Sequence, residues 1–145
     1  MFTWVWDGNR QTETGRLQDG KRNGHWVFRY PNRSVQEGRM VDDMRNGYWV
    51  LRYADGNVWE GVNVDGERNG HWIIRYANGN EAEGDFVDDA ANGQWVWRYA
   101  NRDVHEGPIV DGERHGNWEI RRASETVEVW SYRNGSASDR REHVN

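Results

Sequence analysis

The chain has 145 residues, a length that fits one domain or one short elongated array. Only 35% of the residues are hydrophobic, yet 10 are Trp, 6 Tyr and 3 Phe, a composition that suits a thin structure. Its 24 acidic and 19 basic residues give a net charge of -5, which disfavours nucleic-acid binding because phosphate attraction requires a basic surface. It has no cysteine, which excludes a disulfide framework and a thiolate metal site.

The first residues match neither a secretory signal nor a membrane span. The segment 1–10 lacks a basic start followed by an apolar run, and no later apolar stretch approaches the length of a span. We therefore expect a cytoplasmic protein. Trp4 lies 22 residues before Trp26, and Thr14-Gly15 stands where later units carry Glu-Gly, which predicts a degenerate first repeat.

From Trp26 onward the sequence repeats every 23 residues. Glu-Gly, Asn-Gly and Asp recur at this spacing, and so do three series of larger side chains: Trp26, Trp49, Trp72, Trp95 and Trp118; Tyr30, Tyr53, Tyr76 and Tyr99; Arg29, Arg52, Arg75, Arg98 and Arg121. A fixed period of this length indicates an array of about six similar structural units.

Each unit predicts an antiparallel hairpin. Residues 72–76 are aromatic and β-branched and therefore favour a strand, and residues 80–87 form a second strand. Between them Asn78-Gly79 fit a two-residue type I′ turn, as Asp55-Gly56 do one unit earlier. Residues 65–70 then reverse the chain into the next hairpin. No segment shows the apolar spacing of a helix, so the pattern predicts an all-β, elongated, curved single-layer array.

A turn at Asn78-Gly79 also predicts the register of the hairpin. It places Trp72 opposite Asp85, and strand alternation then puts the Trp and Tyr series on one face of the sheet and the Arg series on the other. Gly84 and its equivalents are expected opposite the small apolar column that contains Ile73.

The pattern weakens after Trp118. Ile120-Arg121 still match, but Arg122 replaces the expected Tyr and no further Glu-Gly follows. Residues 127–130 predict a closing strand. We therefore divide the chain into a repeat array at 1–133, with atypical first and last units, and a polar, flexible tail at 134–145.

The repeat resembles the MORN (membrane occupation and recognition nexus) repeat. The matching pieces are Tyr30-Pro31-Asn32, Glu37-Gly38, Asp65-Gly66 and Arg114-His115-Gly116, and the resemblance spans about residues 4 to 118. It implies a curved β-hairpin array with a groove and a role in protein interaction. The chain departs from the family in two columns: Trp replaces a family glycine in the Trp series, and the Tyr of Tyr-Glu-Gly is replaced by Gln36, Trp59, Ala82 and His105.

Candidate chemistry is sparse. The Glu and Asp columns recur in identical surroundings, whereas a catalytic pair needs two unlike environments at one place. The five histidines show no metal-ligand spacing of the helical or finger type. We therefore predict no catalytic activity, no metal and no cofactor.

Positions that vary on an otherwise regular frame are candidates for partner binding. Trp59 is the sole aromatic in its column, and Trp97 stands where other units carry Phe or aliphatic residues. Because interface centres favour aromatics and arginine, the predicted partner-binding residues are Trp59, Trp97, Arg29, Arg52, Arg75 and Arg98. The Trp and Tyr series are expected to be structural.

The favoured hypothesis is a non-catalytic interaction or scaffolding module that binds a partner protein or peptide along the repeat groove. Two alternatives stay open: a carbohydrate-binding module that uses exposed Trp faces, and a binder of anionic phospholipid head groups, which the acidic balance disfavours. An exposed end strand also offers an edge for a homodimer.

Overall fold

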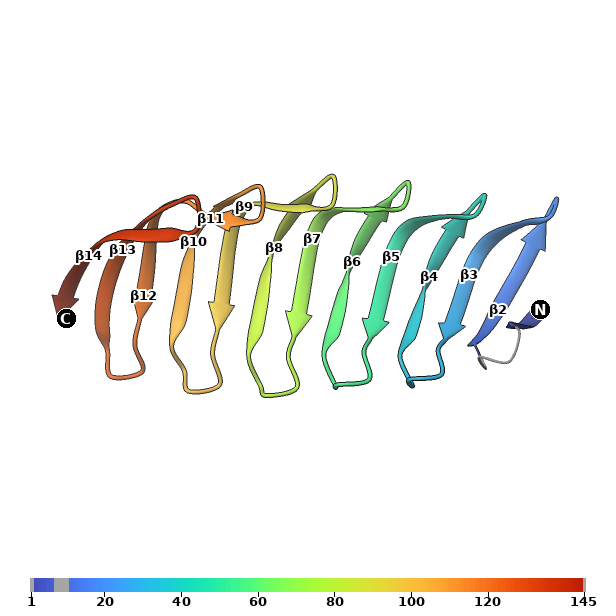
Figure 1. The fold of residues 1–145 in the computed structure, drawn as a ribbon, viewed down its shortest axis with the longest axis horizontal. Helices are drawn as coiled ribbons and strands as arrows, with labels where there is room; N and C mark the ends of the chain where they lie inside the picture. The colour runs from blue at the N-terminus through green and yellow to red at the C-terminus, as the bar shows by residue number, and fades with distance from the viewer. Residues whose placement is uncertain (1, 7–10, 145) are drawn as a thin grey trace.

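The computed structural model describes residues 2–6 and 11–144, with side chains described for 11–137. Within that part of the chain, 14 strands form one open antiparallel sheet, drawn in Figure 1. They are β1 (Phe2–Trp6), β2 (Gln11–Gln18), β3 (Lys21–Arg29), β4 (Val35–Val41), β5 (Met44–Arg52), β6 (Val58–Val64), β7 (Glu67–Arg75), β8 (Glu81–Val87), β9 (Ala90–Arg98), β10 (Val104–Val110), β11 (Glu113–Arg114), β12 (Gly116–Arg121), β13 (Thr126–Arg133) and β14 (Ser136–Val144).

The order of the strands in the sheet follows their order in the chain, and β11 pairs with β10 beside the main path. The predicted all-β class and antiparallel pairing are therefore confirmed. Among the described residues no helix is long and apolar enough to cross a membrane.

The two-residue turns lie at the opposite end of each hairpin from where the sequence pattern placed them. The Tyr76 N–H donates to the Asn80 carbonyl (2.8 Å), and Gly79 has positive φ (94°), so residues 77–79 form a three-residue loop. The Asn78 side chain accepts the Asn80 N–H (3.0 Å), which stabilises this loop instead of a type I′ turn. The tight turns, with positive φ at both residues, are Asp19-Gly20, Asp42-Asp43, Asp65-Gly66, Asp88-Asp89, Asp111-Gly112 and Asn134-Gly135.

The longer loop shifts the expected register by one residue. Trp72 lies opposite Gly84, not Asp85, and Ile73 lies opposite Glu83. The glycine column therefore shares a face with the Trp series, and the expectation that it faces the small apolar column was wrong. The reason is that one extra loop residue moves every partner on the second strand.

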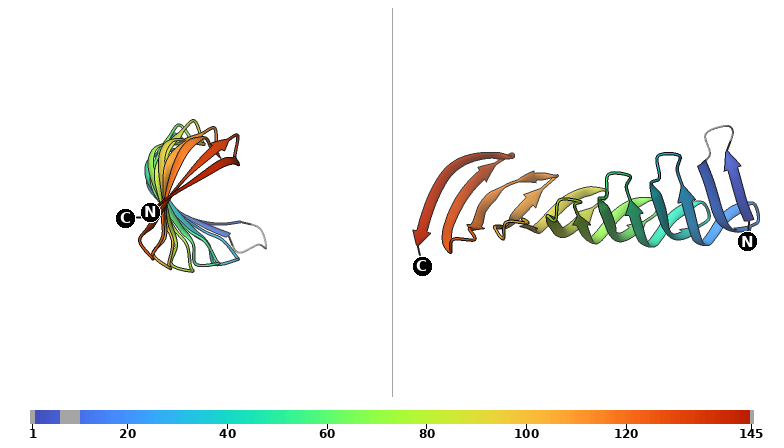
Figure 2. Two further views of the ribbon diagram at one scale, coloured as in Figure 1. Left: turned by 90° about the vertical axis from the view of Figure 1, so that its left-hand side faces the viewer. Right: turned by 90° about the horizontal axis from the view of Figure 1, so that it is seen from below.

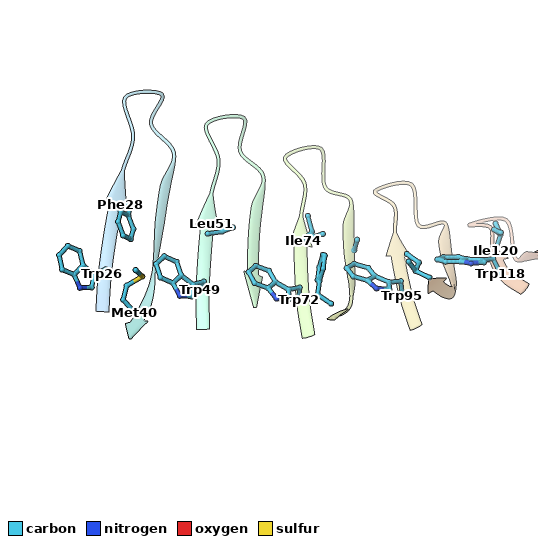
Figure 3. Packing of buried hydrophobic residues seen from close by; sticks show 13 residues of the cluster. Trp26, Phe28, Met40, Trp49, Leu51, Trp72, Ile74, Trp95, Trp118 and Ile120 are labelled. Atoms are coloured by element: carbon cyan, nitrogen blue, oxygen red, sulfur yellow. The ribbon is translucent and has the colours of Figure 1, made fainter. Parts of the chain in front are cut away.

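Each tryptophan of the 23-residue series lies over a glycine of the preceding strand. A Cβ built on Gly15, Gly38, Gly61, Gly84 or Gly107 would stand 2.2–2.5 Å from the nearest indole atom, so the ring occupies the space of the missing side chain. These five tryptophans are at most 1% exposed and form the centre of the core, as Figure 3 shows.

Each indole also completes a β-bulge. Between Gly61 and Asn63 the ladder register shifts, and Val62 has no pairing partner on β7. The indole N–H of Trp72 donates to the Val62 carbonyl (2.8 Å), and the other four tryptophans donate in the same way one residue beyond their glycines. The core residue thus donates to a backbone carbonyl at the bulge; in the last unit the Pro108 carbonyl also accepts the His115 N–H (3.1 Å).

The bulge bends the sheet into an open trough. Gly70 has positive φ (89°) where β7 bends, and Figure 2 shows the strands curved around the long axis of the molecule. Arg68, before the bend, reaches Phe86 on the side that carries Trp72. We call this side, which bears the Trp series, the inner face, and the side that bears Arg52, Arg75 and Arg98 the outer face.

Polar side chains link successive hairpins at both ends. At the tight turns, the Asn46 side chain accepts the N–H of Asp65 (2.9 Å). At the longer loops, the Asn57 side chain accepts the N–H of Ala77 (2.9 Å). These bonds join residues 19 and 20 positions apart, which explains why Asn and Asp recur with the period.

The two ends of the chain extend the sheet. Residues 127–130, where a closing strand was predicted, lie within β13 (Thr126–Arg133). After β13, residues 134–135 form a tight turn and β14 (Ser136–Val144) pairs with β13 from Thr126 to Arg133. Asn134-Gly135 is a strong turn sequence, and both residues have positive φ, which lets the chain reverse and pair with β13.

Candidate functional site

The predicted partner-binding residues lie on two different faces. Trp59 is on the inner face, between Leu51 and Ile74 of the neighbouring strands, and it is half-buried against the core. Trp97 is also half-buried there, with its ring centroid 5.5 Å from that of Trp95. Arg29, Arg52, Arg75 and Arg98 are exposed on the outer face, so the structure does not bring the tryptophans and arginines of the prediction together.

On the outer face, arginines pair with the recurring glutamates. Arg52 bonds Glu37 (2.7 Å) and Arg98 bonds Glu83 (2.6 Å), and Arg75 bonds Glu60 in the same way. The residue before the tryptophan adds a further contact in three units: His25 contacts Glu37 (3.4 Å), the Tyr48 hydroxyl donates to Glu60 (2.7 Å), and His71 contacts Glu83 (3.0 Å).

These contacts keep the outer carboxylates ionised. Hydrogen bonds from Arg52, Arg75 and Arg98 hold the pKa of Glu37, Glu60 and Glu83 below its ordinary value. Such paired charges offer little net positive field to an anionic lipid surface. The three glutamates also share one kind of environment, unlike an acid and base pair.

The inner face carries a second arginine column that the sequence reading missed. Its members are Arg22, Arg45, Arg68 and Arg114, which recur with the same period, and Ala91 takes the fourth place. Three of them place the guanidinium carbon over an aromatic ring of the core. The distance to the ring centroid is 4.2 Å for Arg45 over Trp49, 4.4 Å for Arg68 over Phe86 and 4.3 Å for Arg114 over Trp118. The 23-residue spacing of these arginines could have revealed the column. They were missed because residues such as Arg68 lie in segments that were interpreted as chain reversals.

Each inner arginine faces the variable column, which consists of Glu13, Gln36, Trp59, Ala82, His105 and Glu128. Arg22 pairs with Glu13 (3.0 Å), Arg45 hydrogen-bonds Gln36, and Arg68 lies over the Trp59 ring. In the unit whose variable residue is Ala82, the inner arginine is also absent, and Ala91 takes its place. The variation that suggested partner contacts therefore follows, in part, these pairs within the chain.

His105 faces Arg114 in the same column. Its Nδ1 lies 3.4 Å from the guanidinium, and its ring centroid is 4.7 Å from that of Tyr99. Burial, together with the charge of Arg114, lowers the pKa of His105 from 6.5 to about 4. The imidazole is therefore neutral at pH 7 and contributes no charge to the inner face.

The tyrosines of the repeat stand at the start of the longer loops, beside the inner face. Tyr30 and Tyr76 pack against the core, whereas Tyr53 is 38% exposed. The inner face is thus closed near its tryptophans and accessible near the loop of Tyr53.

A pocket of about 300 Å³ opens on the inner face beside Tyr53. Its lining residues are Arg45, Leu51, Tyr53, Asn63, Gly66, Arg68, Trp72 and Asp89. Asn63 is 4% exposed and occupies a column whose other members are larger and apolar or aromatic: Leu17, Met40, Phe86, Ile109 and Tyr132. A small polar residue in this column leaves the space that forms the pocket.

The burial of the Trp series removes the surface on which the carbohydrate hypothesis depended. Five tryptophans at most 1% exposed cannot present a ring face to a sugar. Trp59 and Trp97 retain partial exposure but are covered on one side by Arg68 and Arg114. In the described part of the chain, no three His, Cys, Asp or Glu side chains are grouped to hold a metal ion.

No family model matches the chain, and no curated protein matches its sequence. Its fold is similar to that of a solved structure, the TCP domain of SAS-4 (dCPAP) of Drosophila melanogaster in complex with a proline-rich motif of Ana2 (dSTIL). The two share 19% sequence identity with a TM-score of 0.57, over 97% of this chain and 82% of the other. At this identity the similarity concerns the fold.

Proposed function

We propose that the chain is a non-catalytic protein-interaction module that binds a peptide segment of a partner along its inner face. The observation that carries this proposal is the pocket beside Tyr53, which joins aromatic, guanidinium and carboxamide groups on one accessible surface. Interface centres are enriched in tyrosine, tryptophan and arginine, which supports a protein partner.

The shape of the sheet and its structural neighbour support a peptide as the ligand. The trough is open along its length, so an extended segment can lie in it without a terminus being enclosed. The TCP domain of similar fold was solved with a proline-rich motif, which is an extended type of ligand. Carbohydrate and phospholipid binding receive less support, because the Trp series is buried and the outer arginines are paired with glutamates.

Three earlier predictions remain predictions. Membership of the MORN family and a cytoplasmic location are two of them. The third is edge-to-edge dimerisation through β1 or β14, the two end strands of the open sheet.

The test uses two tyrosines of similar size on opposite faces. Random peptides are selected by display on the immobilised chain, and the enriched peptides are titrated by fluorescence anisotropy against wild type, Tyr53→Ala and Tyr48→Ala. Tyr53 lines the pocket, whereas Tyr48 is 55% exposed and contacts Glu60 on the outer face. We expect binding to weaken in Tyr53→Ala and to persist in Tyr48→Ala. The opposite pattern, or no enrichment over a blank surface, would contradict the proposal.

A further inference from the structure

The tight turns decide which inner arginines are neutralised. Arg22 bonds Asp43 (3.2 Å), and Arg68 bonds Asp89 (2.6 Å). Each aspartate is the second residue of the tight turn that follows in the next hairpin, 21 positions further along the chain. The backbone supports the contact, because the N–H of Asp89 donates to the carbonyl of Arg68 (3.0 Å).

Arg45 has the same backbone setting without the carboxylate. The N–H of Gly66 donates to the Arg45 carbonyl (2.9 Å), but glycine replaces the aspartate of the equivalent turns. In the variable column Arg45 faces Gln36, where Arg22 has Glu13. Among the described residues Arg45 therefore forms no ion pair.

This guanidinium is also partly withdrawn from water. It lies 4.2 Å from the Trp49 ring centroid, and burial lowers the pKa of Arg45 below its ordinary value. A half-buried charge without a counter-charge is costly, since desolvation is not repaid by an ion pair. The inner face thus holds a cation that an external anion would stabilise.

The carboxamide of Asn63 offers a polar group to the same pocket. Asn63 is 4% exposed and lines the pocket with Arg45 and Gly66. Among the described residues no side-chain polar atom is both fully buried and without a hydrogen bond, so the Asn63 carboxamide keeps contact with the pocket space and can donate to a ligand there. The one carboxylate that also lines the pocket, Asp89, is already bound to Arg68 and leaves Arg45 unpaired.

We propose that this pocket binds the carboxylate of an aspartate or glutamate side chain of a peptide lying on the inner face, with Arg45 as counter-charge and Asn63 as hydrogen-bond donor. This inference rests on the proposed function and adds the chemistry that the peptide must carry. The carboxylate of the ligand takes the position that the carboxylates of Asp43 and Asp89 take beside their own arginines.

The turn supplies a variant that fills the pocket from within. In Gly66→Asp the new carboxylate should pair with Arg45 as Asp89 pairs with Arg68. The backbone permits it, because Gly66 has a φ of 85° and Asp89 has 72° at the equivalent position. Gly112→Asp is the matched control, since its turn faces Ala91 and no arginine.

The probes are terminally blocked peptide pools with Glu, Asp, Gln or Asn at one central position and mixed residues around it. Wild type and Gly112→Asp should bind the acidic pools about tenfold or more tightly than the amide pools, the range expected for one charge-assisted contact. Gly66→Asp should lose this preference. Arg45→Met, which keeps an apolar stem on Trp49, should lose it as well, and serves if Gly66→Asp does not fold.

The outcomes separate this inference from the proposed function. Binding that is weakened by Tyr53→Ala but indifferent to the central acid overturns the carboxylate pocket and leaves the interaction module standing. Retention of the acidic preference in both Gly66→Asp and Arg45→Met also overturns it. A matching set of pools with a free C-terminus is titrated in parallel, and an acidic preference that is present only in that set overturns the side-chain carboxylate as the ligand. Absence of binding to every pool contradicts both proposals.

Discussion

The indole of Trp72 lies against the backbone of Gly61, so that a Cβ on Gly61 would stand 2.3 Å from Cδ2 of the ring. Gly61→Ala must therefore displace a fully buried side chain, and we expect it to destabilise the fold by about 1–3 kcal/mol. Urea unfolding followed by far-UV circular dichroism measures the change. Gly112→Asp has no atom within 4 Å of a Cβ and carries only the cost of a φ of 83°, which Asp89 adopts at the equivalent turn position, so it should destabilise the fold less than Gly61→Ala. Equal stability of Gly61→Ala and wild type would show that the ring can move aside.

The indole N–H of Trp72 should contribute separately from its ring. Trp72→Phe leaves the Val62 carbonyl at the bulge without its donor, which we expect to cost about 1–3 kcal/mol beyond the lost packing. In the described part of the chain Trp59 donates no such bond and is half-buried, so Trp59→Phe should cost less than about 1.5 kcal/mol. The same unfolding assay compares the two variants, and a larger loss for Trp59→Phe would contradict the assignment of the buried ladder.

The stability of the fold should depend on His105 in weakly acidic solution. Its pKa is about 4 in the folded chain against 6.5 for an ordinary histidine. As the pH falls from 6.5 to about 4, the unfolded chain takes up this proton and the folded chain does not, so stability is lost across that window. His105→Gln, which copies Gln36 of the same column, removes this dependence. Unfolding free energies measured across the window should fall less steeply in the variant than in wild type; parallel slopes would mean that the imidazole is not shielded as described.

Arginines of the two faces should differ in their effect on stability. Arg75 is 49% exposed and pairs with Glu60, so Arg75→Ala should change stability by less than about 1 kcal/mol. Arg68 stacks on Phe86, lies over Trp59 and bonds Asp89, so Arg68→Ala should cost about 1–3 kcal/mol. Thermal melts of both variants decide the order. Peptide binding should be unchanged in Arg75→Ala, and its loss there would move the binding surface to the outer face.

The 23-residue period was enough to predict the strands, the all-β class and the faces of the Trp, Tyr and Arg series, because strand alternation follows directly from sequence spacing. The faces of the second strand depend on the register, and there Trp59 lies on the inner face, opposite Leu51 and Ile74, instead of opposite the Arg series. The register was not predictable from the dipeptide Asn78-Gly79 alone. Asn-Gly suits a type I′ turn and also the end of a three-residue loop, and the Asn78 side chain bond to Asn80 decides for the loop. The one extra loop residue was sufficient to place Gly84 opposite Trp72 instead of opposite Ile73.

The candidate site was predicted in part. Trp59 and Trp97 do lie on the face that carries the pocket, but the arginines chosen with them lie on the outer face. The inner arginines were missed because their contacts cross the bend of a strand, and the bend depends on the bulge near Gly70. Nor could the sequence show that the Asn63 side chain lines a pocket, since this depends on the packing of neighbouring hairpins.

The pairing of every strand with its neighbours in sequence has a consequence for how the chain folds. No long excursion separates the strands of a pair, so the loops that must close are short and folding should be fast for an all-β protein. Folding can start at any hairpin and spread in both directions, since each new hairpin pairs with the edge strand of a hairpin that has already formed. Unfolding should run the other way, from the two ends towards the middle, where the pocket lies. Amide protons near Trp72 should therefore be among the last to exchange with solvent.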